Sequence, residues 1–349
     1  MRSPRWIAAT AFLALALTSA PKRSPAAAGA DPVAALRPAV SELSVMTYNV
    51  KGLPFPVALA RSDALMQIGQ RLARLRQTGM QPHIIALQEA FTPEAKAIAA
   101  LAGYRYVALG PQGDVPGRDP AQAMPPAFRS AAHWLKGETE GKWLDSGLVI
   151  LSDYPIRRSL RMAFPSDACA GFDCLAAKGV LVAWIDVPGH AQPVAIADTH
   201  LNSRGASGVL VSRADAAFAR QLDALRSFLQ ANVPARDPLV LAGDFNIGHI
   251  AQRQAAARKL DALLDPQDEA TRAAEKAGQA HTSPDIAAIL ERAKDREFFR
   301  PGTRTPITFG AISVPFGQDN GASALSDHIG FITHYTLGND PADKANTSS

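Results

Sequence analysis

The sequence lacks an apolar run long enough to span a bilayer, which needs about 20 residues. Its candidate, Ile7 to Leu17, is shorter, with arginines before it and small residues after it. This layout is typical of a secretory signal peptide. We therefore expect residues 1–30 to be a signal peptide and lead-in, cleaved after Ala20 or Ala30. The mature chain should be periplasmic or secreted, without a transmembrane span.

Cysteine is scarce, because the chain of 349 residues has only Cys169 and Cys174. Two thiols without a neighbouring histidine make a poor zinc site. In an exported chain, a close pair of cysteines favours a disulfide. We expect a bridge that closes a short loop.

An excess of one charge is also missing. Residues 1–30 carry four of the 36 basic residues and no acidic one, so the mature chain has 32 basic against 32 acidic residues. Nucleic-acid binders draw much of their affinity from a positive field. Nucleic acid is therefore the less favoured partner, although a local basic patch remains open.

Several enzyme signatures are absent from the sequence. There is no Gly-x-Ser-x-Gly elbow, no phosphate loop that ends in Gly-Lys-Ser/Thr, and no His-Glu-x-x-His. Serine hydrolases, nucleoside triphosphatases and zinc proteases therefore lose their best support.

Strands and helices alternate along the chain, which predicts an α/β fold. The expected catalytic domain spans residues 41–336, with a helical insertion at 250–297 and a polar tail at 337–349. Strands are expected at 43–48, 83–87, 147–151, 180–187, 193–197, 238–247, 305–312 and 329–335, and helices at 58–78, 92–102 and 209–231.

A long segment, residues 110–146, is rich in proline and glycine and carries Met124, Phe128, Trp134 and Trp143. Long loops in compact domains are usually functional or disordered. The aromatic residues could line a lipid or sugar site, or they could pack the loop down. The sequence favours neither.

Polar residues occur at the ends of several expected strands. They are Asn49, Glu89, His200, Asp244, Asn246 and the Ser326-Asp327-His328 run. In an extended chain, Asp244 and Asn246 would point to the same side of the sheet. Each residue alone could equally cap a turn or pack in the core, but together they predict an active site at one sheet edge.

These groups suggest a metal site for phosphate chemistry. Carboxylate and amide oxygens without a thiolate suit Mg²⁺, or Mn²⁺ or Ca²⁺, better than zinc. A magnesium site with few protein carboxylates completes its shell with water and substrate phosphate. Hydrolysis of a phosphate ester is the expected reaction.

The ordered motifs resemble the endonuclease/exonuclease/phosphatase superfamily. They are Thr47-Tyr-Asn49, Gln88-Glu89, Thr199-His-Leu201, Gly243-Asp-Phe-Asn246 and Ser326-Asp-His328. The segments 145–156 and 173–179 are similar to those of the secreted bacterial neutral sphingomyelinases. The superfamily resemblance implies a four-layer α/β/β/α sandwich, in which two mixed sheets pack face to face with helices outside.

The resemblance also implies a role for each residue. Glu89 would be the main metal ligand, with Asn49 as a helper. His328, held by a neighbouring acid, would take the proton of the attacking water. Asp244 and Asn246 would position the water and the phosphoryl group, and His200 would donate a hydrogen bond to a phosphoryl oxygen.

The roles of Asp327, of Lys178 and of the acid partner of His328 are less defined. Asp327 is counted with the catalytic residues, although it could simply cap a turn. Lys178 is interpreted as a solvated charge, with contact to a phosphate as the less favoured alternative. Many superfamily members carry a Leu-Asp-Tyr type segment, one strand before the Ser-Asp-His, whose aspartate supports the histidine. The corresponding residues 299–321 contain no such match, and Asp319 is their only acidic residue. The acid partner of His328 is therefore undetermined.

The leading functional hypothesis is an exported, metal-dependent phosphodiesterase that acts on a phospholipid head group, as sphingomyelinases do. The alternatives are an extracytoplasmic nuclease or sugar-phosphate or inositol-phosphate phosphatase on the same scaffold, and a binding protein with a degenerate site. The head group, the metal and the oligomeric state are undetermined.

Overall fold

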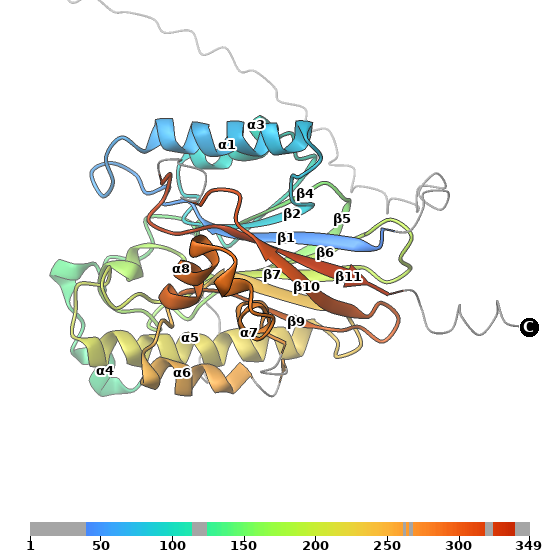
Figure 1. Ribbon diagram of the computed structural model, residues 1–349. Helices are drawn as coiled ribbons and strands as arrows, with labels where there is room; N and C mark the ends of the chain where they lie inside the picture. The colour runs from blue at the N-terminus through green and yellow to red at the C-terminus, as the bar shows by residue number, and fades with distance from the viewer. Residues whose placement is uncertain (1–39, 114–123, 261–262, 265–267, 318–323, 339–349) are drawn as a thin grey trace, which may run out of the picture.

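Two mixed β-sheets pack face to face in the computed structural model, with helices on both outer faces (Figure 1). The structure describes residues 40–113, 124–260, 263–264, 268–317 and 324–338. Helices α1 and α3 cover one sheet, and α5 and α6 cover the other. The predicted four-layer α/β/β/α sandwich is confirmed.

The two sheets have six and five strands. The first has the order β10 (Ile307–Ser313), β11 (Phe331–Leu337), β1 (Glu42–Asn49), β2 (Ile84–Gln88), β4 (Val149–Ser152) and β3 (Tyr106–Leu109). The second has the order β5 (Ile156–Ala163), β6 (Gly179–Ile185), β7 (Val194–His200), β8 (Leu239–Asp244) and β9 (Asp295–Arg300).

The core between the sheets follows from the alternation of side chains along the strands. Leu43 and Val45 of β1 pack against Ile196 of β7 and Val240 of β8, and all four are fully buried. Burying an aliphatic side chain of this size contributes about 1.5–3 kcal/mol. This layer fixes the two sheets against each other and so fixes the relative positions of their strand ends.

The outer helices bury one apolar face each. Helix α1 (Arg61–Gln77) packs Leu65, Ile68 and Leu72 on the first sheet, and α5 (Val211–Asn232) packs Phe218 and Leu225 on the second. The shorter helices are α2 (Pro93–Lys96), α3 (Ile98–Ala102), α4 (Pro126–Ser130), α6 (Ala251–Ala257), α7 (Ala270–Lys276) and α8 (Pro284–Arg292). Single 3₁₀ turns are η3 (Trp134–Lys136), η4 (Gly171–Leu175), η5 (Arg258–Leu260) and η6 (Gln279–His281).

Some expected elements were wrong or missed. The helical insertion does not reach residue 297, because α8 ends at Arg292 and β9 begins at Asp295. The stretch 295–300 is rich in charge and looks helical, but alternate residues of β9, from Asp295 to Phe299, are buried between the sheets. Strands β3 and β5 were not expected at all. The expected hairpin of β6 and β7 is confirmed.

Residues 1–30 and almost all of the 337–349 tail lie outside the described residues, so the signal peptide stays a prediction. The domain bounds 41–336 also stay a prediction. In the described part, no helix has both the length and the apolar character that crossing a bilayer requires.

Candidate active site

The topology brings several strand ends to one edge of the sandwich. Strands β1 and β2 are parallel, with Asn49 opposite Gln88, and β7 and β8 are parallel, with His200 opposite Asp244. Strand β9 runs antiparallel to β8, so its first residue, Asp295, lies opposite Asp244. The edge therefore collects residues from both sheets.

His328 reaches this edge by a different route from the one expected. The Ser326-Asp327-His328 run does not end a strand but precedes β11. Because β11 is antiparallel to β1, its beginning lies at the edge where β1 ends. The Ser326 hydroxyl donates to the Asn49 carbonyl (2.7 Å) and accepts from the His328 amide (3.2 Å), which ties this loop to β1.

Asp244 lies at the centre of the cluster and is buried. Its Oδ2 accepts from Asn49 Nδ2 (3.2 Å) and lies 3.5 Å from His200 Nε2 and 3.7 Å from His328 Nε2. Burial works to raise the pKa of Asp244, but the neighbouring histidines and Lys178 outweigh it and lower that pKa. Asp244 is therefore an anion that contacts both candidate histidines.

A turn, and not strand alternation, places Asn246. The expectation that Asp244 and Asn246 point to the same side of an extended strand was therefore wrong. Strand β8 ends at Asp244, and Asn246 has a left-handed φ of 51°. The Asp244 Oδ1 accepts from the Asn246 amide (2.9 Å), which makes an Asx turn. The Asn246 Nδ2 donates to the Leu201 carbonyl (3.1 Å), and buried Arg253 donates to the Asn246 carbonyl (2.8 Å). Asn246 still lies beside Asp244.

Glu89 follows β2 with a φ of 56°, a conformation that is uncommon outside glycine and is found at functional sites. A Cβ on Gly147 would lie 3.0 Å from the Glu89 Cα, so glycine is needed there for this close approach. Asn49 Nδ2 donates to Glu89 Oε1 (2.8 Å). Burial raises the pKa of Glu89, and nearby Asp244 adds to the rise.

The acid partner of His328 is Asp295, which the sequence interpretation had missed. His328 Nδ1 lies 2.8 Å and 3.0 Å from the two Asp295 oxygens. Burial alone would lower the pKa of His328, but the attraction of Asp295 and then Asp244 raises it to about 9. The aspartate lies at the start of β9, in Lys294-Asp295-Arg296, so the search over 299–321 was too late in the chain. Only the β8–β9 register reveals it.

The structure does not bring Asp327 into this cluster. Its side chain is 57% exposed and pairs with Lys51 Nζ at 3.2 Å. The pKa of Asp327 is lowered, since His328 and Lys51 together outweigh the effect of burial.

Lys178 is buried, so its interpretation as a solvated charge was wrong. Its Nζ lies 3.1 Å from each of Asp173 Oδ1, His200 Nε2 and the Leu201 carbonyl. A lysine has only donors, so His200 must accept through Nε2 and carry its proton on Nδ1. Burial and then the Lys178 charge lower the pKa of His200 to about 3, which keeps this ring neutral.

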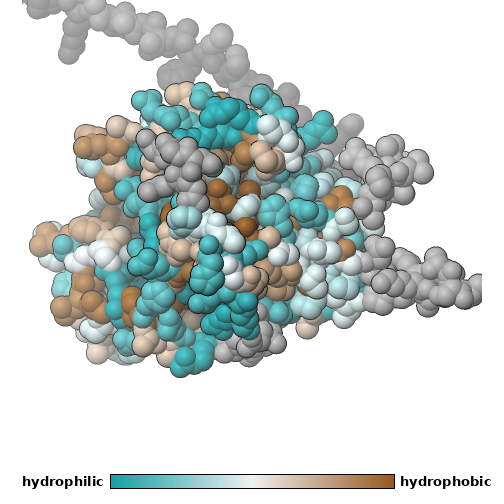
Figure 2. All heavy atoms as spheres, in the orientation of Figure 1, coloured by the Kyte–Doolittle hydropathy of each residue, from teal (hydrophilic) through white to brown (hydrophobic). Residues whose placement is uncertain are grey.

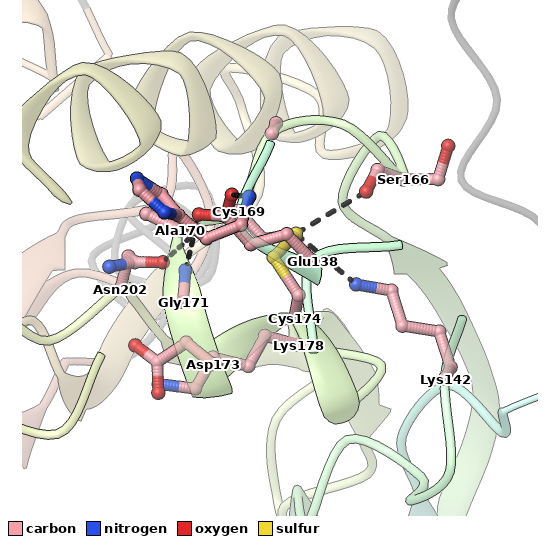
Figure 3. Close-up of a disulfide and its surroundings, with 12 residues drawn as sticks. Glu138, Lys142, Ser166, Cys169, Ala170, Gly171, Asp173, Cys174, Lys178 and Asn202 are labelled. Carbon is pink, nitrogen blue, oxygen red and sulfur yellow. Dashed lines mark hydrogen bonds and ion pairs between the residues drawn. A yellow bond between two sulfur atoms is a disulfide. The ribbon is translucent and has the colours of Figure 1, made fainter. Parts of the chain in front are cut away.

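The predicted disulfide between Cys169 and Cys174 is confirmed (Figure 3). It closes the loop that carries Asp173. The Asp173 Oδ2 accepts from the Ser203 amide (2.6 Å), and the Asn202 Oδ1 accepts from the Ala170 amide (2.9 Å). The bridged loop is thus attached to the segment that follows His200, and it presents Asp173 to Lys178.

Comparison with known proteins identifies the family. The model of the Endonuclease/Exonuclease/phosphatase family matches residues 46–328. The chain belongs to this family. A search of curated protein sequences found no significant match.

Solved structures share the family fold at low sequence identity. Sphingomyelinase C from Streptomyces griseocarneus is 22% identical, with 84% of this chain and 99% of that chain covered and a TM-score of 0.56. A variant of beta toxin from Staphylococcus aureus with bound magnesium ions is 17% identical, with the same coverage and a TM-score of 0.54. An endonuclease/exonuclease/phosphatase from Beutenbergia cavernae is 21% identical, covers 86% and 73%, and has a TM-score of 0.54.

Members of the Endonuclease/Exonuclease/phosphatase family are metal-dependent phosphoester hydrolases, and the acidic residues here fit a divalent cation. Ligand atoms of Glu89, His200 and Asp244 lie within 4.8 Å of one another. Among the described residues, no basic nitrogen pairs with Glu89, so its carboxylate is free to bind a cation. Asn49 fits less directly, because its Oδ1 accepts from the Lys51 amide (3.0 Å) and its nitrogen faces the carboxylates. Asn49 could bind a cation through Oδ1 only if its side-chain amide flips by about 180°.

Proposed function

We propose that the protein is an exported, Mg²⁺-dependent phosphodiesterase that hydrolyses a phospholipid head group, with sphingomyelin as the leading substrate. One observation carries the proposal: Glu89, Asp244 and the His328–Asp295 pair meet at one edge of the sandwich. Family membership supports the reaction class. The fold shared with a sphingomyelinase C, and the magnesium ions of the beta toxin variant, favour this substrate and metal.

In this proposal His328 is the general base. Only its neutral ring can take the proton of the water, so activity should increase as the pH approaches its raised pKa of about 9. Asp295 holds the Nδ1 edge of the ring, so the Nε2 edge faces Asp244 and the reaction centre. Asp244 and Asn246 orient the attacking water. Glu89 would hold the metal ion, which would supply Lewis-acid stabilisation of the charge that develops on a phosphoryl oxygen in the transition state.

In this proposal Lys178, and not His200, stabilises the charge on a second phosphoryl oxygen. The Nε2 of His200 accepts from Lys178 and cannot donate at the same time. The three N–H groups of Lys178 are taken by His200, Asp173 and the Leu201 carbonyl, so Lys178 acts as a buried cation that stabilises developing negative charge, and not as a hydrogen-bond donor. His200 then positions Lys178, together with Asp173.

Two features favour a lipid substrate over nucleic acid. The mature chain is neutral, so a general positive field is missing. The Phe and Trp side chains that are more than 40% exposed in the described part are Phe55, Trp134, Trp143 and Phe172. Phe55 follows β1, Phe172 lies within the disulfide-closed loop, and Trp134 and Trp143 precede that loop in the chain.

A release assay with the purified mature protein tests the proposal. Sphingomyelin, phosphatidylcholine, duplex DNA and an inositol polyphosphate are offered with Mg²⁺, Mn²⁺, Ca²⁺ or a chelator. We expect Mg²⁺-dependent release from sphingomyelin, lost with chelator and in His328→Ala, but kept in the exposed control His281→Ala. Preference for DNA with a steep salt dependence would instead support a nuclease. Release that survives both chelator and His328→Ala would contradict the mechanism.

A further inference from the structure

A cavity of about 360 Å³ lies beside the disulfide and outside the catalytic cluster. It is lined by α4, by the 138–142 segment, by Arg213 of α5 and by Cys169 and Cys174. In Figure 3, Lys142 approaches Cys169 from the side opposite to Asp173 and Asn202. Neither Glu89, Asp244 nor His328 lines this cavity.

The cavity has a surplus of positive charge. Lys142 is half-buried, and its Nζ has one polar contact among the described residues, Cys169 Sγ at 3.8 Å. Arg129 also lacks an acidic partner in the described part of the chain. Arg213, by contrast, is neutralised by Glu138 (2.8 Å). The other acid is Asp167, whose Oδ2 accepts from the Met124 amide (2.8 Å).

Lys142 is therefore a cation that burial disfavours and that no carboxylate compensates at contact distance. Burial lowers the pKa of Lys142 to about 8. An anion in the cavity would pair with Lys142 and Arg129. It would offset the free energy that desolvation of the Lys142 charge costs. Two cations that line one cavity suit a phosphate group, which offers several acceptor oxygens.

Exposed apolar side chains lie next to the cavity-lining residues in the sequence. Trp134, Leu135 and Trp143 flank the 138–142 segment, and they are 66%, 70% and 69% exposed. Figure 2 shows apolar side chains gathered along the left margin, where α4 lies in Figure 1. Monomeric proteins rarely expose large apolar side chains in groups unless they contact a partner or a membrane. Tryptophan in particular favours the head-group layer of a bilayer.

We propose that the cavity between Arg129 and Lys142 is a second, non-catalytic phosphate site, which binds the head group of a membrane phospholipid. Trp134, Leu135 and Trp143 enter the interfacial layer around that lipid. The two sites would then hold different lipids, one being cleaved and one acting as an anchor. The inference rests on the proposed lipid substrate, to which it adds a docking surface.

Vesicle binding tests this site without turnover, in the His328→Ala background. Vesicles of phosphatidylcholine, with and without anionic phosphatidylglycerol, are co-sedimented with the protein. We expect Arg129→Gln with Lys142→Gln to weaken binding to anionic vesicles on the order of tenfold or more, since each cation near such a surface contributes. Trp134→Ala with Trp143→Ala should weaken binding to both vesicle types. The matched controls Arg105→Gln and Met80→Ala, on exposed residues away from the site edge, should bind like the parent.

Further arms separate the source of the phosphate and the two proposals. The cavity could bind free phosphate only. In that case Lys142→Gln would weaken the binding of inorganic phosphate but leave vesicle binding unchanged, and the proposal would be overturned. Unchanged vesicle binding in both double variants, or none in the parent, also overturns it. If the protein with His328 intact binds vesicles through Lys142 but releases no head group, the proposed function is refuted while the docking site is still supported.

Discussion

At the residue scale, the sequence revealed the groups whose role can be inferred from their immediate neighbours. Glu89, Asp244 and His328 each stand in a short motif next to an apolar strand. Asp295 and Lys178 were missed because their roles depend on tertiary contacts. Asp295 is defined by its register opposite Asp244, and Lys178 by burial against His200. Neither contact leaves a local pattern in the chain.

The pairing of His328 with Asp295 predicts a strong effect of Asp295→Asn. The amide keeps the shape of the side chain but cannot stabilise the protonated ring, so we expect kcat to fall about 10²- to 10⁴-fold. An NMR titration should show that the pKa of His328 falls from its raised value, because its main electrostatic partner is gone. Asp327→Asn, which alters an exposed ion pair, is the control and should retain most activity. The opposite ranking of the two variants would refute Asp295 as the partner.

Lys178→Gln should lower kcat with little change in KM, since the lysine acts on charge that develops in the transition state. Loss of one group that stabilises such charge typically costs about 10²–10³-fold in rate. Lys142→Gln, on the other side of the disulfide, is the matched control. It should leave kcat on a water-soluble short-chain substrate unchanged. Equal rates for both variants on that substrate would remove Lys178 from the mechanism.

At the element scale, periodicity predicted the elements with a clear apolar stripe or alternation, such as α1, α5, β7 and β8. It failed for β9, because this strand buries Asp295 and Glu297 between the sheets. A hydrophobicity pattern cannot identify a strand whose buried face is acidic. The same cause hid the catalytic pair, since Asp295 is the first residue of that strand.

The disulfide-closed loop predicts a measurable cost of removing the bridge. Closing a loop this short should stabilise the fold by about 2 kcal/mol through the entropy of the unfolded chain. We expect Cys169→Ala with Cys174→Ala to lower the urea-unfolding free energy by this amount, and to lower activity because the loop carries Asp173. The intact mass of the parent should correspond to the oxidised pair. Two free thiols in the exported protein would contradict the bridge.

At the scale of the whole molecule, the alternation of strands and helices predicted an α/β fold, and the superfamily resemblance implied the sandwich. What it could not predict is that the layer between the sheets is partly polar. Below the catalytic edge lie Asp198 and Glu297, both fully buried. Gln88 donates to Asp198 (2.7 Å), and Tyr335 donates to Glu297 (2.8 Å). One oxygen of each carboxyl has no partner among the described residues. Burial raises the pKa of both groups.

The buried Glu297 predicts that the fold loses stability as the pH rises. Burial raises its pKa from 4.5 to about 8, so between these values the folded chain keeps a proton that the unfolded chain releases. The free energy of unfolding should therefore fall from pH 4.5 to about pH 8, where the loss is complete. Glu297→Gln keeps an acceptor for Tyr335 but cannot ionise, so its stability should fall less steeply over this range. The exposed control Glu140→Gln should follow the parent. Urea unfolding at pH 5, 7 and 9 measures all three proteins, and parallel curves for the parent and Glu297→Gln would show that Glu297 does not titrate in the fold.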